Sequence, residues 1–228
     1  TSEERWDTAV AVFSQLLKYY PNYKDAYLRR GYAFFSSGDT VSALADFDKL
    51  LSIDKFSPDG HAARGFLLNS MKQSDMALLE MNEAIRLEPY CVNYYVNRGV
   101  VLTDMGDSTG ALADYDHAIE LDASCVPAFF NRALLRTGAG MNRLALDDYD
   151  EVVELDPSNY AAIYNRALLK REMKMYRSAV NDISKIIEEY PDFYPAYSIR
   201  SELKSRLNDR GGAAADYAEM VRLRNQAV

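Results

Sequence analysis

Seven alanines recur along this chain at a constant interval of 34 residues, with no insertion or deletion between them. They are Ala9, Ala43, Ala77, Ala111, Ala145, Ala179 and Ala213. Each is followed four positions later by a large side chain, such as Phe47 or Tyr115, and three positions further on by another apolar residue. Because spacings of four and three keep side chains on one face of an α-helix, the pattern predicts one amphipathic helix in every 34-residue unit.

A second helix precedes the alanine-bearing helix in each unit. Two segments of this second kind are nearly identical, FNRALLR at 130–136 and YNRALLK at 164–170. Glycines such as Gly38 and Gly106 separate the two helices of a unit, and prolines such as Pro89 and Pro157 separate neighbouring units. One helix pair cannot bury its apolar faces but a stack of pairs can, so we expect an all-α repeat protein.

These residues resemble the signature of the tetratricopeptide repeat (TPR) family. The resemblance implies a right-handed α–α superhelix, or TPR solenoid. It also implies a single TPR domain over 1–228, with an N-terminal half-repeat and six full 34-residue repeats. The half-repeat is 1–23, and the full repeats are 24–57, 58–91, 92–125, 126–159, 160–193 and 194–227. The chain departs from the family in carrying Arg instead of Leu at one position of every full repeat.

Each of these arginines precedes an acidic residue by sixteen positions. The pairs are Arg30 with Asp46, Arg64 with Glu80, Arg98 with Asp114, Arg132 with Asp148, Arg166 with Asp182, and Arg200 with Asp216. An Arg within an apolar helix face is costly unless it is paired, and its planar fork suits a carboxylate. We therefore interpret the twelve residues as a structural ion-pair ladder. Two alternatives stay open: pairing with the acid of the preceding repeat, and contact of some arginines with a ligand.

By the resemblance, the first helix of each repeat faces a concave groove. Asn occupies the position before the Arg in three consecutive repeats, and an amide can donate to and accept from a peptide backbone. The predicted peptide-binding residues are Asn97, Asn131, Asn165, Phe66, Val100, Phe130 and Tyr164. The alternative is that the amides bond to a neighbouring helix and that the apolar side chains pack between helices.

Other classes of function find little support in the sequence. The net charge of −8 is a poor match for nucleic acid, and no apolar run approaches the roughly 18 residues of a membrane span. His61 and His117 have no metal-spaced partners, and no phosphate loop or catalytic constellation is found. The lysines of the family's carboxylate clamp, which grips chaperone tails, are missing from the corresponding positions. We therefore expect no enzyme activity, no cofactor and no metal.

The predicted function is a protein–protein interaction scaffold that binds a peptide or partner protein in the concave groove. One alternative is self-association through an uncapped N-terminal face that carries Trp6, Phe13 and Leu16. Another is the TPR region of a longer multidomain protein, such as a glycosyltransferase, whose TPR segment resembles this one in its row of asparagines. Because the chain begins with Thr1 rather than Met, we expect it to be a segment or a processed form. Cys91 and Cys125 are too far apart in a repeat array for a disulfide, so we expect two thiols. Thiols suit a reducing compartment such as the cytoplasm, although similar repeats also occur in the periplasm.

Overall fold

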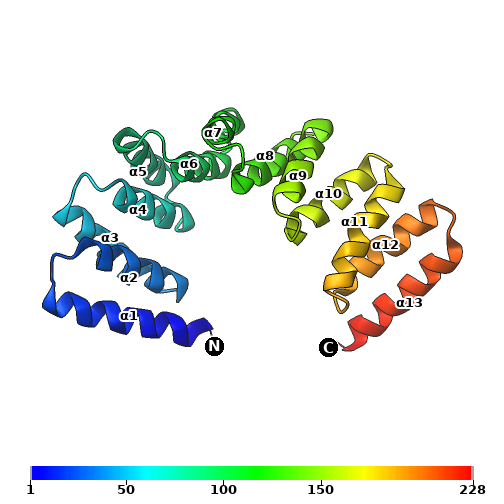
Figure 1. The fold of residues 1–228 in the computed structure, drawn as a ribbon, viewed down its shortest axis with the longest axis horizontal. Helices are drawn as coiled ribbons and strands as arrows, with labels where there is room; N and C mark the ends of the chain where they lie inside the picture. Colours follow the sequence, from blue (N-terminus) through cyan, green and yellow to red (C-terminus); the bar gives the residue numbers. More distant parts are fainter. Residues whose placement is uncertain (1, 227–228) are drawn as a thin grey trace. The chain divides into compact units, whose positions relative to one another are not determined.

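The computed structural model describes residues 2–226, and this part of the chain is entirely helical, with no β-strand (Figure 1). The helices are α1 (Ser2–Tyr19), α2 (Lys24–Ser36), α3 (Thr40–Ile53), α4 (Pro58–Ser70), α5 (Ser74–Leu87), α6 (Val92–Asp104), α7 (Ser108–Leu121), α8 (Val126–Gly138), α9 (Asn142–Leu155), α10 (Tyr160–Glu172), α11 (Tyr176–Glu189), α12 (Tyr194–Arg206) and α13 (Arg210–Gln226). The even-numbered helices begin at the residues with which the six predicted repeats begin. The predicted all-α helical-repeat fold is confirmed.

The chain forms two compact units, Thr1–Ala123 and Ser124–Val228. In unit 1 the pairs α2–α3, α4–α5 and α6–α7 are hairpins, and α1 packs on α2 as a half-repeat (Figure 1). In unit 2 the hairpins are α8–α9, α10–α11 and α12–α13. Each hairpin also packs on the next one within its unit, for example α5 on α6 and α11 on α12, as expected for a repeat array.

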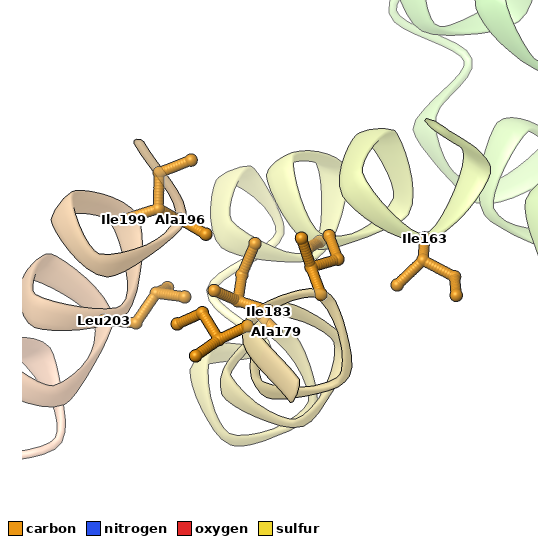
Figure 2. Close-up of a cluster of buried hydrophobic side chains, with 9 residues drawn as sticks. Ile163, Ala179, Ile183, Ala196, Ile199 and Leu203 are labelled. Carbon is orange, nitrogen blue, oxygen red and sulfur yellow. The ribbon is translucent and has the colours of Figure 1, made fainter. Parts of the chain in front are cut away.

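The predicted apolar rows form the core of both units. Ala43, Phe47, Ala77 and Met81 are fully buried in unit 1. Figure 2 shows the corresponding cluster of unit 2, in which Ile163 of α10, Ala179 and Ile183 of α11, and residues of α12 are gathered. The small alanines permit close approach of the helices, and the large residues four positions later fill the space between them. Tyr217, at the equivalent position of α13, is 59% exposed.

A residue with positive φ follows the first helix of every repeat. Gly38, Gly106 and Gly140 occupy this position in three repeats, with φ between 72° and 89°. The other three repeats place Lys72, Lys174 and Asn208 there, at φ of 60° to 63°. Only the glycines were predicted as turn residues. Glycine in a sequence indicates that the backbone can adopt a positive φ, whereas Lys or Asn at the same position gives no such indication.

The N-terminal face is less open than expected. Phe13 and Leu16 are partly buried against a cluster formed by α1, α2 and α3, whereas Trp6 is 38% exposed. Cys91 and Cys125 are not joined by a disulfide. None of the described helices is both long and apolar enough to cross a membrane.

Candidate functional site

The six arginines of the first helices each lie against the acid sixteen positions later, within the same repeat. Arg98 is representative: its Nε donates to Asp114 Oδ2 at 2.8 Å and its Nη2 donates to Oδ1 at 2.6 Å. Arg30, Arg166 and Arg200 repeat this two-pronged geometry at 2.6–2.9 Å. Arg132 also binds Asp148 through Nε and Nη2. We call these pairs, together with Arg64–Glu80, the arginine ladder.

The arginines have a third contact that was not predicted from the sequence. The Nη1 of Arg98 donates to Asn82 Oδ1 at 2.8 Å, sixteen positions earlier. Arg166 reaches Asp150 in the same way, and Arg200 reaches Ser184. Each of these arginines therefore connects its own helix with the second helix of its repeat and with the second helix of the preceding repeat. The signal in the sequence is a polar residue sixteen positions before the Arg.

The Arg64 rung differs because its partner is Glu80, whose side chain is one methylene longer. Nη2 of Arg64 donates to Glu80 Oε1 at 2.6 Å, and Nη1 donates to Asp48. The buried Nε has no hydrogen-bond partner in the described part of the chain. His61 approaches the other oxygen of Glu80, with 2.7 Å between Nδ1 and Oε2.

The rungs of unit 2 contain a second cation. Lys170 Nζ donates to Asp182 Oδ2 at 2.8 Å, and Arg136 and Lys204 bind Asp148 and Asp216 similarly. Burial would raise the pKa of Asp216, but hydrogen bonds from Arg200 and Lys204 outweigh it and hold that pKa below its usual value. The corresponding positions in unit 1 are Phe34, Leu68 and Leu102. The ladder arginines are thus bound to other residues of the protein. The remaining residues of the first helices are the candidates for a ligand site.

Three of the predicted binding residues, Phe66, Asn97 and Val100, line one pocket of about 130 Å³ in unit 1. This unit-1 pocket lies on α4 and α6, and Met81 and Val101 are buried at its base. The side-chain amide of Asn97 is only partly exposed and makes no hydrogen bond to any described residue. Its donor and acceptor are therefore available at the edge of an apolar pocket.

A polar network that was not predicted from the sequence forms another wall of the unit-1 pocket. Asn69 is 8% exposed, and its Nδ2 donates to Asp104 Oδ2 at 2.8 Å. Its Oδ1 accepts from Ser74 Oγ at 3.0 Å, and Lys72 Nζ lies 3.9 Å from Asp104 Oδ2. These bonds fix Asn69, so Asn97 is the amide of this pocket that remains open to a ligand.

The other predicted binding residues lie in unit 2. Asn131 on α8 and Asn165 on α10 are half-buried, and neither amide bonds to a described residue. Phe130 packs edge-to-face on the buried Tyr149, with 6.2 Å between ring centroids, so it belongs partly to the core. Tyr164 lines a separate pocket of about 360 Å³, together with Tyr160, Ala161, Ile186, Tyr190 and Phe193. We call this the aromatic pocket.

Comparison with family models decides what kind of chain this is. Three models match, over residues 2–59, 92–125 and 161–192, and each describes a tetratricopeptide repeat. Together these matches span more than half of the chain.

The chain belongs to the tetratricopeptide repeat family. Proteins built from these repeats are in general interaction scaffolds, and this TPR protein is one of them in that general sense. No curated protein sequence matches it.

Solved structures share the fold at low sequence identity. PilF of Pseudomonas aeruginosa is 20% identical with a TM-score of 0.77, over 88% of this chain and 91% of that one. Cut9, from an APC/C hetero-tetramer with Hcn1, is 14% identical with a TM-score of 0.76, over 97% of this chain and 44% of that one. YrrB, described as a TPR protein with an unusual peptide-binding site, is 22% identical with a TM-score of 0.58, over 81% and 95%. At these identities the likeness shows the fold alone.

Proposed function

We propose that this TPR protein is a non-catalytic module that binds an extended peptide segment of a partner protein on the exposed face of its first helices. Asn97 in unit 1, and Asn131 and Asn165 in unit 2, would bind the peptide backbone. In unit 1, an apolar peptide side chain would enter the unit-1 pocket beside Phe66 and Val100. In unit 2, apolar peptide side chains would contact Phe130 and Tyr164.

The observation that carries the proposal is the unpartnered amide of Asn97 beside an apolar pocket. The amide atoms of Asn97 are not among the buried side-chain atoms that lack a hydrogen-bond partner in the described part of the chain, so a ligand can reach them, and a peptide group supplies one acceptor and one donor that match them. Burial of an adjacent apolar peptide side chain adds hydrophobic stabilisation. The same partnerless amide recurs at Asn131 and Asn165, which favours a repeated contact with a repeated chemical group, and the repeated group of a peptide is its backbone.

Two further facts support a peptide rather than a small-molecule ligand. The unit-1 pocket is small, about 130 Å³, which suits one aliphatic side chain better than a whole cofactor. A structural neighbour, YrrB, is itself described as having a peptide-binding site, although its identity to this chain is only 22%.

A peptide array probed with the wild-type protein and with an Asn97→Ala, Asn131→Ala, Asn165→Ala triple variant tests the proposal. We expect the triple variant to lose binding to most of the peptides that the wild type retains. The matched control replaces three exposed asparagines elsewhere, Asn22, Asn181 and Asn225, by alanine and is expected to bind normally. Wild-type-like binding by a folded groove variant would exclude the backbone-reading role.

Self-association is the competing hypothesis, and exposed Trp6 is the observation that favours it. Static light scattering over a range of protein concentrations distinguishes the two. A dimer that forms with rising concentration and is lost in Trp6→Ala would favour assembly over peptide binding.

A further inference from the structure

The repeat at 160–193 carries aromatic residues at four positions, two of which, Tyr160 and Tyr164, also pack partly against the core of unit 2. It places Tyr160, Tyr164, Tyr190 and Phe193 where the first repeat has Lys24, Leu28, Asp54 and Ser57. In no other repeat is more than one of these four positions aromatic. All four side chains line the aromatic pocket, which lies wholly within unit 2.

The fold itself does not require aromatic residues at these positions. In the first repeat, Lys24 Nζ forms an ion pair with Asp54 Oδ2 at 2.6 Å, at the two positions that Tyr160 and Tyr190 occupy in the fifth. The position of Tyr190 is acidic in each of the first four repeats: Asp54, Glu88, Asp122 and Asp156. The first three repeats therefore form the same fold with no aromatic residue at any of the four positions.

The four rings meet in pairs and leave a concave space. Tyr160 and Tyr190 are edge-to-face, with 5.1 Å between centroids and 89° between planes. Tyr164 and Phe193 are 6.0 Å apart at 66°. Ile186 is buried at the base, while Tyr190 and Phe193 remain 49% and 40% exposed. Aromatic rings that are exposed to water around a cavity often mark a binding site, because a ligand that covers them removes apolar surface from water.

The charges around the aromatic pocket favour a cation. Aromatic faces are regions of negative potential, and no basic residue lines the pocket in the part of the chain described. Burial raises the pKa of Tyr160, and the carboxylate of Glu189 lies close enough to the hydroxyl to raise it further. Glu188 and Asp192 are further exposed acids within two positions of Tyr190.

We propose that the aromatic pocket binds the guanidinium group of an arginine side chain carried by the partner's peptide. Arg fits better than Lys because its planar group is weakly hydrated, lies flat on aromatic rings and can pair with a carboxylate such as Glu189 through two N–H groups. The chain already uses the same contact internally: the guanidinium of Arg98 lies 5.6 Å from the centroid of the Tyr95 ring. The peptide origin of the arginine rests on the proposed function, but the chemistry of the pocket does not.

The test uses N-acetyl-arginine-N-methylamide as a probe in an NMR titration of the full chain. We expect chemical-shift changes confined to residues of the aromatic pocket. We also expect binding about five-fold tighter than that of the citrulline analogue, which has the same shape without the charge. Equal binding of the citrulline or leucine analogue would overturn the proposal. Tighter binding of the trimethyllysine analogue would overturn the choice of arginine.

A double variant, Tyr160→Lys with Tyr190→Asp, copies the ion pair of the first repeat into the fifth. It removes two rings with residues that this fold already accepts at these positions, and we expect it to abolish the shift changes. Tyr190→Leu provides a second check, because it alters one half-exposed side chain, and it should weaken arginine binding several-fold. Glu189→Gln should weaken the arginine probe and leave the citrulline probe unchanged.

These outcomes are independent of the peptide-array experiment. Loss of peptide binding in the asparagine triple variant says nothing about the arginine probe, whose pocket contains none of those residues. Conversely, peptides that bind normally but show no preference for arginine would reject only the aromatic-pocket proposal.

Discussion

Replacing Arg98 by leucine leaves a buried carboxylate without its counter-charge. Asp114 is 5% exposed and receives both of its charged hydrogen bonds from Arg98. The position that holds a second cation in unit 2 is Leu102 here, so no other basic side chain contacts Asp114 in the described part of the chain. The same substitution at Arg166 is milder in principle, because Lys170 still donates to Asp182 at 2.8 Å.

The loss of unfolding free energy expected for each variant follows from the burial and the partners of its arginine. Removal of one partner from a buried ion pair costs about 3–5 kcal/mol. Since the Arg98 side chain is partly exposed to solvent, we expect about 3 kcal/mol for Arg98→Leu, at the lower end of that range. For Arg166→Leu we expect about 1.5–2 kcal/mol, the net value of one charged hydrogen bond rather than three, because Asp182 keeps a cation and Asp150 is exposed to water.

Variants that remove both the Arg and its acid should distinguish the two rungs further. Arg98→Leu with Asp114→Leu removes both charges, so it should be less destabilised than Arg98→Leu alone, by about 1–2 kcal/mol. Arg166→Leu with Asp182→Leu should show no such recovery, because buried Lys170 then becomes the uncompensated charge.

Urea unfolding monitored by circular dichroism measures these differences, with the transition of each variant fitted for midpoint and slope. The Leu102→Ala variant provides a control for the loss of apolar packing near the rung. Equal losses of unfolding free energy for Arg98→Leu and Arg166→Leu would refute the idea that the unpaired carboxylate causes most of the destabilisation. So would an Arg98→Leu, Asp114→Leu double variant that is as unstable as Arg98→Leu alone.

Four other substitutions probe the turns, the helix contacts and the response to acid. Lys174→Gly should stabilise the protein by about 1 kcal/mol, because it relieves a positive φ of 60°, whereas Gly140→Ala at the same turn position should destabilise it similarly in a thermal melt. Gly99→Ala should cost about 1–3 kcal/mol by the same measurement, since an added Cβ would lie 2.5 Å from the Tyr115 ring. The depressed pKa of Asp216 implies stability that is present above its unfolded value of about 3.9 and is lost as pH falls through the lower folded value. An acid titration should therefore show wild type and Asp216→Asn converging in stability as the pH falls below the depressed pKa of Asp216, and a constant difference would contradict that assignment.

The repeat arrangement could be predicted from the sequence because its signal is summed over seven copies. Fixed spacing located the start of each first helix, and the offset of sixteen positions identified the acid that faces each Arg. A separation of sixteen residues places the Arg on the first helix of a repeat beside the acid on the second helix. Because the same separation occurs in all six repeats, it strongly favours a direct contact between the two side chains.

What the sequence did not predict depends on single copies or on backbone conformation. Lys72 and Lys174 do not look like turn residues, although they adopt the same backbone conformation as Gly38. The aromatic pocket is built in one repeat only, from residues up to 33 positions apart, so no periodicity marks it. Whether the asparagine amides form hydrogen bonds within the protein depends on the residues around them in the fold. The identity of a residue in the sequence does not show whether a hydrogen-bond partner lies within reach.

The contact of Nη1 with the preceding second helix has a practical consequence for dissecting this protein. Arg30 already relies on α1 in this way, because its Nη1 donates to Ser14 Oγ at 3.0 Å. A fragment cut at the first residue of a repeat would therefore lose one ligand of its leading guanidinium. Shortened versions should instead begin one helix earlier, as α1 precedes α2 here, so that the leading guanidinium keeps its contact with the preceding second helix.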